Sequence, residues 1–366
     1  MRILLIADSI QQGGVGRVAS ILSDYFSSTG NTVSILLMAQ DRIQEGSYIK
    51  NDNIALKFLS AEAGTANIRP MLKLQTMRRI IAEDKSDVAI AFINEYCEYA
   101  VLATRFLHTK VIVGEVTDPH VSPKNKILRF LRSPLYGLAD RVVLQTEDMM
   151  SFFPKYVQGK SQIIFNPISP DLPEPYVGIR RKCIVSVGRL NELKNFQMGI
   201  LAFSNFHRSH PEYTYEIYGE GPYRSSLEEL IRAQNLESSV FLKGHDGSVL
   251  DKIRDASIFV MPSNYEGMSN ALIEALAIGI PCISTDHPVG AARMLIQSGT
   301  NGILIPVGDT NALFEAMNKI VDNACLAMNL ADEAIKLRNK LAVEKIAGQW
   351  MDCCKLVLKR KGKNGK

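Results

Sequence analysis

The sequence predicts an α/β protein with two Rossmann-like domains, each built on a doubly wound parallel sheet. Its 366 residues exceed what a single hydrophobic core usually supports. Short apolar runs alternate with helical patterns along the chain, which indicates parallel strands joined by crossover helices. Four prolines between Phe165 and Pro175 indicate a linker. We therefore expect one domain over residues 1–170, a second over residues 171–340, and a C-terminal segment over residues 341–366.

The individual elements follow from apolar runs bounded by glycine, proline and polar residues. The expected strands lie at residues 2–7, 32–38, 54–59, 88–92, 111–114, 141–144, 163–164, 183–187, 213–218, 240–242, 257–261, 282–285 and 302–305. The helices expected between them include those near residues 70–83, 95–107 and 124–138, and the final helix covers residues 343–358. Because ligands bind beyond the carboxyl ends of such strands, the loops that follow them hold the candidate site residues.

The composition narrows the class of protein. The formal net charge of +4 is too small to argue for nucleic acid as a partner. The six cysteines lack the Cys-x-x-Cys spacing of zinc and redox sites, so we expect reduced thiols and no metal. No run approaches the roughly 18 to 20 apolar residues of a transmembrane helix, and Met1–Ala7 has no signal-peptide pattern. We expect a cytoplasmic protein, either free or peripheral on the inner face of the membrane.

A glycine-rich turn follows the first strand. Gly13, Gly14 and Gly16 precede an amphipathic helix that ends near Ser28, so their backbone N–H groups are placed to reach a phosphate or a carbohydrate. Their spacing differs from Gly-x-Gly-x-x-Gly, and no acidic residue clearly ends a second strand about 20 residues later. A dinucleotide site is therefore not indicated, and a plain tight turn is the alternative.

A polar loop follows the strand at residues 111–114. Asp118 and His120 lie in this loop and are candidates for contact with a substrate. The alternative is a structural histidine, which is commoner for a lone histidine in a loop.

The segment at residues 124–138 is amphipathic. Five apolar residues fall on one helical face, opposite Lys126, Arg129 and Arg132, and Pro134 is expected to kink the helix. Either the apolar face covers the sheet and the basic face lies in water, or the helix meets an anionic membrane. The basic tail, formed by Lys359, Arg360, Lys361, Lys363 and Lys366, is either solubilising or attracted to anionic lipid.

The second domain opens with a cationic loop. Gly188, Arg189 and Lys194 follow the strand at residues 183–187. Arginine offers a planar fork to two oxygens and lysine a mobile point charge, so this loop suits a diphosphate. Ordinary surface charges are the alternative.

The stretch from Pro262 to Pro281 combines a strand end, a glycine and a helix start. Glu266 and Gly267 lie in the loop, and Asn270 is the expected N-cap of a helix that places Glu274 in its first turns. A helix N-terminus attracts phosphate. An isolated carboxylate in an apolar helix costs desolvation unless a donor pairs with it. The alternative is a solvated pair of glutamates, because their spacing alone is weakly specific.

The order Pro262-Ser-x-x-Glu266-Gly267-x₆-Glu274-Ala, followed by Gly279-x-Pro281, resembles the signature of family-four retaining glycosyltransferases of the GT-B fold. The resemblance implies two Rossmann-like domains facing each other across a cleft, an Asn166-Pro-Ile hinge, and a final helix that crosses back to the N-terminal domain.

The resemblance also implies roles for individual residues. Glu266 would contact the donor sugar and Glu274 the ribose of the nucleotide, while Arg189 and Lys194 match the diphosphate-binding pair. Asp118 and His120 would lie in the acceptor-side loop, and Gly16 replaces an acidic residue of the family's glycine loop. The remaining donor-binding candidates are Gly13, Gly14, Gly188, Gly219, His245, Gly267, Met268, Ser269, Asn270 and Ala271.

The function implied is retaining, metal-independent transfer of a sugar from a UDP- or GDP-linked donor. No cofactor is expected beyond this nucleotide-sugar co-substrate, and the chain contains no Asp-x-Asp. The acceptor would be a glycan, with a polyprenyl-diphosphate carrier favoured, in cell-surface polysaccharide synthesis. A sugar-nucleotide epimerase of the same fold and a noncatalytic nucleotide-sugar binding protein are the alternatives.

Overall fold

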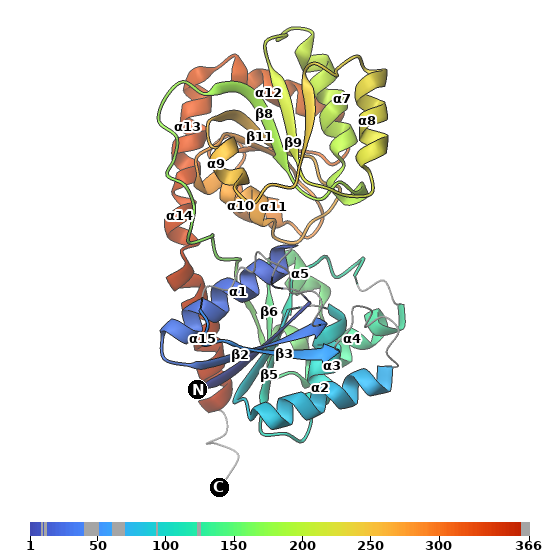
Figure 1. The fold of residues 1–366 in the computed structure, drawn as a ribbon, viewed down its shortest axis with the longest axis vertical. Coiled ribbons are helices and arrows are strands. Elements are labelled where there is room, and N and C mark those ends of the chain that lie inside the picture. The colour runs from blue at the N-terminus through green and yellow to red at the C-terminus, as the bar shows by residue number, and fades with distance from the viewer. Residues whose placement is uncertain are drawn as a thin grey trace. The chain divides into compact units, whose positions relative to one another are not determined.

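The chain divides into two compact units. The computed structural model describes residues 1–8, 10, 13–39, 51–60, 70–92, 94–122 and 126–359. One unit contains Met1–Pro167 and the stretch from Leu341 onward, and the other contains Ile168–Lys340 (Figure 1). Lys124 and the basic tail from Arg360 lie outside the described residues.

The first unit contains a parallel sheet whose strand order is β3-β2-β1-β4-β5-β6-β7. Its strands are β1 (Arg2–Ala7), β2 (Thr32–Ala39), β3 (Ala55–Ser60), β4 (Val88–Ala91), β5 (Lys110–Glu115), β6 (Arg141–Leu144) and β7 (Ser161–Ile163). Its helices are α1 (Gly13–Ser28), α2 (Pro70–Asp84), α3 (Asn94–Thr104), α4 (Lys126–Leu138), α5 (Glu147–Phe152), α6 (Lys155–Gln158) and α15 (Val343–Lys359). The strand order reverses between β1 and β4, as in doubly wound sheets.

The second unit repeats this topology with the order β10-β9-β8-β11-β12-β13. Its strands are β8 (Arg181–Val187), β9 (Thr214–Tyr218), β10 (Val240–Gly244), β11 (Ala256–Met261), β12 (Cys282–Thr285) and β13 (Ile303–Ile305). Its helices are α7 (Phe196–His207), α8 (Arg224–Ala233), α9 (Val249–Ile253), α10 (Asn270–Ala277), α11 (Ala291–Leu295), α12 (Thr310–Val321), α13 (Ala324–Ile335) and α14 (Leu337–Lys340). The predicted fold class, two parallel-sheet α/β domains, is confirmed.

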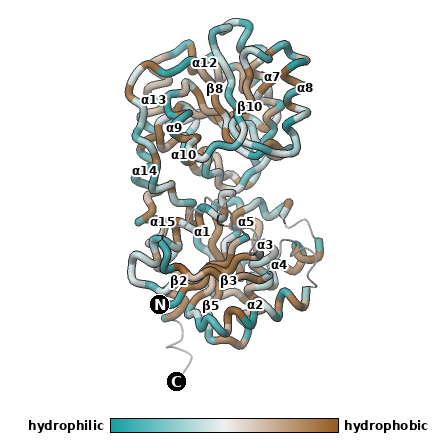
Figure 2. The backbone as a smooth tube through the Cα atoms, viewed as in Figure 1, coloured by the Kyte–Doolittle hydropathy of each residue, from teal (hydrophilic) through white to brown (hydrophobic). Residues whose placement is uncertain are grey.

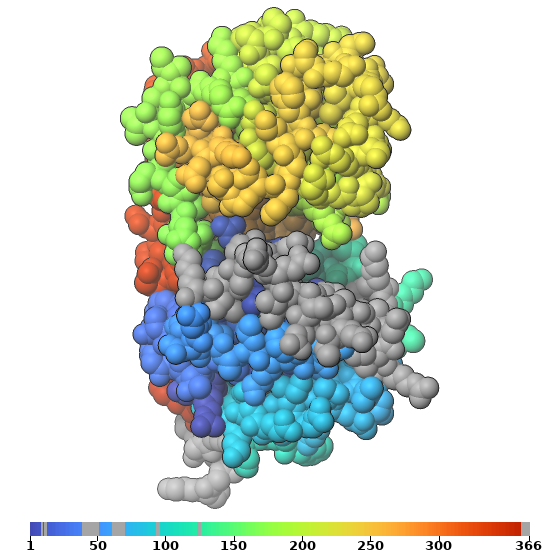
Figure 3. Space-filling model, in the orientation of Figure 1, coloured from blue at the N-terminus to red at the C-terminus, as the bar shows by residue number. Residues whose placement is uncertain are grey.

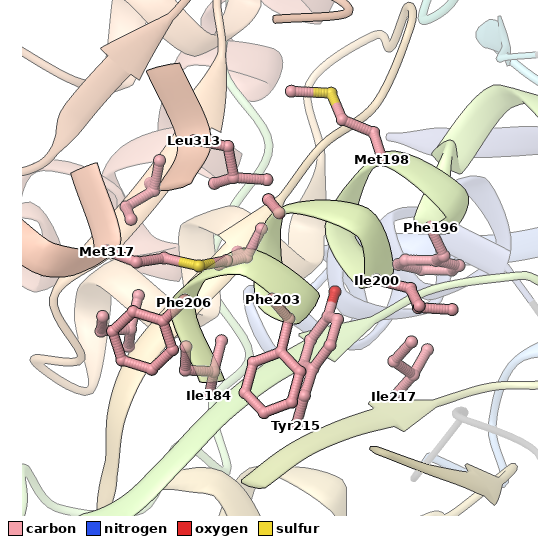
Figure 4. Packing of buried hydrophobic residues seen from close by; sticks show 14 of the residues in the cluster. Ile184, Phe196, Met198, Ile200, Phe203, Phe206, Tyr215, Ile217, Leu313 and Met317 are labelled. Carbon is pink, nitrogen blue, oxygen red and sulfur yellow. The ribbon is translucent and has the colours of Figure 1, made fainter. Parts of the chain in front are cut away.

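Continuous apolar strands form the centre of each unit. In β1, the residues from Ile3 to Ala7 are fully buried, because helices cover both faces of a parallel sheet. Figure 2 shows these central strands as the most hydrophobic part of the first unit. In the second unit, Phe203 of α7 packs on Tyr215 of β9 with ring centroids 5.6 Å apart (Figure 4). The Tyr215 hydroxyl is 2.8 Å from the Ser186 hydroxyl, so the polar end of this ring is also satisfied.

Helix α15 belongs to the first unit although it ends the chain. The Trp350 ring meets Phe92 edge to face, with ring centroids 5.2 Å apart. A Cβ atom at Gly114 would lie 3.3 Å from the Trp350 ring, so the indole packs directly on β5. In Figure 1, α15 runs beside α1.

The six cysteines are free thiols. Cys97, Cys353 and Cys354 are buried in the first unit, and Cys183 and Cys282 are buried in the second. Cys325, near the start of α13, is exposed.

Two local predictions are wrong. Gly13, Gly14 and Gly16 lie in the first turn of α1, because the helix begins at Gly13 rather than after the glycines. Ser269, which has the extended backbone of a cap, is the N-cap of α10, so Asn270 is the first helical residue.

Figure 3 shows α2 and α8 at the surface of their respective units.

Candidate functional site

The candidate donor site lies where the strand order of the second unit reverses. Strands β8 and β11 are neighbours there, and β8 connects onward to β9 while β11 pairs with β12. A switch point of this kind leaves room for a ligand beyond the carboxyl ends of the strands. The loop after β8 carries Arg189 and Lys194, and the loop after β11 carries Glu266.

The loop after β8 is held by asparagines. Asn191 caps a short 3₁₀ helix (Glu192–Lys194), accepting from the Lys194 backbone N–H at 3.2 Å. Asn195 then takes a left-handed conformation with φ of 46° and caps α7. The Asn195 amide donates to Asn264 at 2.9 Å, and the Asn264 N–H donates to the Leu193 carbonyl at 2.8 Å. These bonds fix the β8 loop against the β11 loop.

Lys194 and Glu266 form an ion pair at this junction. The Lys194 Nζ is 2.5 Å from the Glu266 Oε1, and both side chains are largely shielded from solvent, with 15% and 12% exposed. The Ser263 hydroxyl donates to the same carboxylate oxygen at 3.2 Å. Arg189, in contrast, is exposed and has no ion-pair partner among the residues that the structure describes. The Lys194 ammonium is therefore paired with a carboxylate, whereas the Arg189 guanidinium is open to a ligand.

The start of α10 completes this part of the site. Gly267, Met268 and Ser269 lead into the helix, and Ser269 makes no side-chain cap bond, so the first N–H groups of α10 lack that partner. Asn270 and Ala271 form the first turn, and Glu274 follows on the same helix with only 5% of its surface exposed. The burial of Glu274 confirms that it is not a solvated surface glutamate.

Gly188 and Gly219 have a structural reason to be glycine. A Cβ atom at Gly219 would lie 1.9 Å from the Gly188 carbonyl oxygen, and Gly219 has a φ of 144°. A Cβ atom at Gly188 would lie 2.9 Å from the Lys194 Cε. Both glycines therefore let the backbone loops approach each other and make room for Lys194.

The loop after β10 carries His245, which is exposed. The neighbouring Asp246 accepts from the backbone N–H and the hydroxyl of Ser248, each at 2.8 Å, and pairs with Lys252. The hydrogen bond from Lys252 is the main reason that the pKa of Asp246 is lowered to about 2. Asp246 is thus engaged within its own loop, while His245 is accessible to a ligand.

In the first unit, Asp118 and His120 lie in the loop after β5. Asp118 is buried and its Oδ1 accepts from the His120 backbone N–H at 2.8 Å, so it shapes the loop. His120 is exposed and packs edge to face on Phe152, with ring centroids 4.8 Å apart. The histidine is therefore the member of the pair that is open to a ligand.

A buried ion pair beneath this loop was missed by the sequence reasoning. Arg132 of α4 and Glu115 of β5 are fully buried, with 3.3 Å between the Arg132 Nη1 and the Glu115 Oε2. The Tyr136 hydroxyl donates to the same oxygen at 3.1 Å. Arg132 also donates to the carbonyl oxygens of Pro119 and Ser122, at 2.6 and 2.5 Å. Burial raises the pKa of the Glu115 carboxyl, and Arg132 opposes that rise.

The prediction for the α4 segment is wrong about which face is buried. Arg132 and Tyr136 face inward, because Glu115 and the loop carbonyls bind them. Ile127 and Phe130 face solvent with 69% and 81% exposed, and Leu131 and Leu138 are also exposed. Arg132 therefore cannot contact lipid, while an apolar surface on α4, formed by Ile127, Phe130, Leu131 and Leu138, is open.

His287 is a second residue that the sequence reasoning missed. It is fully buried in the loop after β12, and its Nε2 has no hydrogen-bond partner within the described part of the chain. Lys194 and Glu266 are close enough for their charges to act on its pKa, which burial lowers. The signal that could have found it is its position just beyond the carboxyl end of a central strand, at the same edge as Gly188 and Glu266.

Two hollows of the second unit are lined by residues that the structure describes. One of about 260 Å³ lies beside the β8 loop and is lined in part by Asn191, Asn195 and Asn264. The other, of about 520 Å³, is lined by residues that include Arg181, Glu216 and Lys243. Neither lining includes Arg189, Lys194 or Glu266.

The described residues contain no group of three or more histidine, cysteine, aspartate or glutamate side chains arranged to hold a metal ion. Among the described helices, none has the length and apolar character needed to cross a membrane.

Comparisons with known proteins identify relatives of this chain. A family model for glycosyl transferases group 1 matches residues 178–337. A Campylobacter jejuni protein, N-acetylgalactosamine-N,N'-diacetylbacillosaminyl-diphospho-undecaprenol 4-alpha-N-acetylgalactosaminyltransferase, is 30% identical over 289 residues, which cover 75% of each chain. The amylovoran biosynthesis glycosyltransferase AmsD of Erwinia amylovora is 25% identical over 96% of this chain and 99% of its own.

Among solved structures, the sucrose-phosphate synthase of Thermosynechococcus elongatus superposes with a TM-score of 0.83 at 18% identity, covering 98% of this chain and 99% of that one. A likeness at this identity concerns the fold. This likeness in fold and the relative at 30% identity over three quarters of both chains together identify the family. The chain belongs to the group 1 glycosyl transferases and has the GT-B fold.

Proposed function

We propose that this glycosyltransferase moves a sugar from a nucleoside-diphosphate donor, UDP- or GDP-linked, to a glycan acceptor with retention of the anomeric configuration. The observation that carries the proposal is the junction of the β8 and β11 loops, where Lys194 pairs with Glu266 ahead of the N-terminus of α10, while Arg189 is exposed in the β8 loop. Arg189 and Lys194 bind the diphosphate, Glu266 contacts the donor sugar, and Glu274 holds the ribose. Gly13, Gly14 and Gly16 are further candidates for contact with the donor.

The chemistry proposed for this site is electrostatic. Negative charge builds on the diphosphate as the bond to the sugar breaks, and preorganised cations and helix N–H groups stabilise that charge. The donor competes for both members of the Lys194–Glu266 pair, because its phosphate binds the ammonium and its sugar hydroxyls bind the carboxylate. The acceptor attacks from the face that the diphosphate leaves. Arg189 and Lys194 take the place of a metal ion.

We propose a lipid-linked acceptor in cell-surface polysaccharide synthesis. The name of the Campylobacter jejuni relative describes a sugar chain on diphospho-undecaprenol, and that of the Erwinia amylovora relative describes polysaccharide synthesis. The apolar surface on α4 supports contact with a membrane, where such an acceptor resides. The protein would then work on the cytoplasmic side, bound peripherally, with His120 next to the acceptor.

The proposal is tested by incubating the chain with UDP-glucose, UDP-galactose, UDP-N-acetylglucosamine, UDP-N-acetylgalactosamine and GDP-mannose, with and without chelator. We expect slow hydrolysis of one donor, or transfer to undecaprenyl-diphosphate-linked sugars, with an α-linked donor giving an α-linked product. Inversion would contradict the retaining mechanism, and loss of activity with chelator would contradict metal independence. A sugar nucleotide that returns as its epimer, or that binds without reaction, would favour the corresponding alternative.

A further inference from the structure

We propose that His287 recognises the donor sugar: its Nε2 accepts a hydrogen bond from one of the sugar hydroxyl groups. This inference rests on the proposed function and adds to it a residue of the sugar-binding pocket.

The loop that carries His287 is built against the loop that carries Glu266. The Thr285 hydroxyl donates to the Ser263 carbonyl at 2.6 Å, and the Asp286 N–H donates to the Ile305 carbonyl at 2.7 Å. Val289 follows with a φ of 64°, which is unusual for a β-branched residue. Bonds to β13 and to the loop after β11 thus hold the conformation of this loop, and His287 is close enough to Lys194 and Glu266 for their charges to act on its pKa.

The tautomer of His287 follows from its one hydrogen bond. Its Nδ1 lies 3.1 Å from the Pro288 carbonyl oxygen, and a carbonyl oxygen can only accept, so Nδ1 carries the proton. In the neutral ring, Nε2 is then a lone-pair acceptor. A phosphate oxygen is also an acceptor and cannot satisfy it. A sugar hydroxyl can.

Burial keeps the ring neutral. Desolvation lowers the pKa of His287, with Lys194 acting in the same direction and Glu266 and Asp286 acting against it. An acceptor that is fully buried and unpaired among the described residues carries a desolvation cost. The groups that approach it, Lys194 and Glu266, are those that the proposed donor engages. A donor that separates this pair opens the way to Nε2 and supplies the missing partner.

The test measures kcat/KM for hydrolysis of the nucleotide sugar that the wild type cleaves, and for each of its mono-deoxy analogues. We expect one analogue to react about 3- to 10-fold more slowly than the parent donor with the wild type, as for one neutral hydrogen bond. With His287→Phe, which removes the acceptor, parent and analogue should react at equal rates. With His287→Gln, whose amide oxygen can accept, part of the difference should return.

Two further readouts and a control variant separate a sugar contact from a structural role. UDP or GDP alone should bind wild type and His287→Phe equally, because neither nucleotide carries the sugar. Protonation converts Nε2 into a donor, so kcat/KM for the wild type should fall at a pH below 6.5, and this fall should be absent in His287→Phe. His210→Phe, at a loop histidine outside the site, is the matched control and should retain both wild-type behaviours.

The inference is overturned if His287→Phe has a thermal midpoint that shows it is folded and still distinguishes each deoxy analogue from the parent donor as the wild type does. In that case Nε2 holds a buried water only, while the transferase assignment stands. If His287→Phe does not fold, the pH profile of the wild type decides, and a kcat/KM that stays flat below pH 6.5 overturns the inference. If no donor is cleaved or bound by the wild type, the proposed function and the inference both fail.

Discussion

At the scale of single residues, Arg189 and Lys194 carry the proposed stabilisation of the leaving diphosphate. We expect Arg189→Ala and Lys194→Ala each to lower turnover about 10²- to 10³-fold, as when one preorganised donor is removed. Donor hydrolysis and the thermal midpoint are measured together, and the midpoint should change little for Arg189 because its side chain is exposed. Lys182→Ala is the control, since this exposed cation lies at the opposite end of β8. Near wild-type turnover in either variant would remove that residue from the diphosphate site.

Glu274 is assigned to the ribose of the donor. A charged hydrogen bond contributes about 1.5 to 3 kcal/mol, so Glu274→Gln should weaken binding of the nucleoside diphosphate by about 10- to 100-fold. Titration calorimetry with UDP and GDP measures this directly. Glu228→Gln, at an exposed glutamate of α8, should bind as the wild type does. Equal affinity in wild type and Glu274→Gln would exclude the ribose role.

The buried Arg132–Glu115 pair makes a prediction about stability. Arg132→Met leaves the Glu115 carboxylate without its cation, which typically costs about 3 to 5 kcal/mol of unfolding free energy. Adding Glu115→Gln removes the stranded charge and should recover part of that loss. Denaturant unfolding measures both. If the double variant is no more stable than Arg132→Met, the pairing energy is not the source of the loss.

At the scale of elements, α4 changes how membrane attachment should work. The basic face cannot hold the protein on lipid by itself, because Arg132 is buried and Arg129 is bonded to the carbonyl oxygens of His120 and Val121. In the proposed membrane attachment, the apolar surface on α4 would take over that role. Insertion of one phenylalanine contributes about 1.5 to 3 kcal/mol.

Phe130→Ser should therefore reduce sedimentation with vesicles about 10-fold or more, whereas high salt should reduce it only slightly. Neutral and anionic vesicles at low and high salt are compared, with Ile179→Ser as a control for an equally exposed apolar residue of the second unit. Binding that salt abolishes, or that Phe130→Ser leaves intact, would restore an electrostatic account. Absence of binding to all vesicles would remove the membrane proposal.

The same helix marks the limit of prediction from the sequence. The strands were predictable because continuous apolar runs such as Ile3 to Ala7 have one stable environment, the middle of a parallel sheet. The α4 pattern is ambiguous, because either face of an amphipathic helix can turn inward. Its orientation is set by Glu115, 17 residues earlier in the chain than Arg132. A contact of that kind has no local signature.

The candidate site divides in the same way. Glu266, Glu274, Arg189 and Lys194 were predictable because they follow strands within a recognisable spacing. For His287 the sequence offers only its place just after a strand, because its burial and the lack of a hydrogen-bond partner at Nε2 among the described residues are seen only in the structure. The predicted N-cap of α10 differs by one residue from the observed one, because serine and asparagine are both good caps.

At the scale of the whole molecule, the distribution of buried and exposed cysteines allows local unfolding to be followed by thiol labelling. A thiol reagent should label one site in the native protein, Cys325, because the other five thiols are buried. Burial also raises the pKa of each of the five, to about 11 for Cys183 and about 12 for Cys354. In denaturant all six should react. Fast native labelling of more than one thiol would contradict this arrangement.

Pulse labelling followed by peptide mass spectrometry would then assign each opening event to one of the two units. Modification at Cys97, Cys353 and Cys354 reports the first unit, and modification at Cys183 and Cys282 reports the second. If a nucleotide sugar is added, protection should appear at Cys282 first, since β12 leads directly into the His287 loop. Three buried thiols in the first unit and two in the second let a mass spectrum identify which unit a substrate protects.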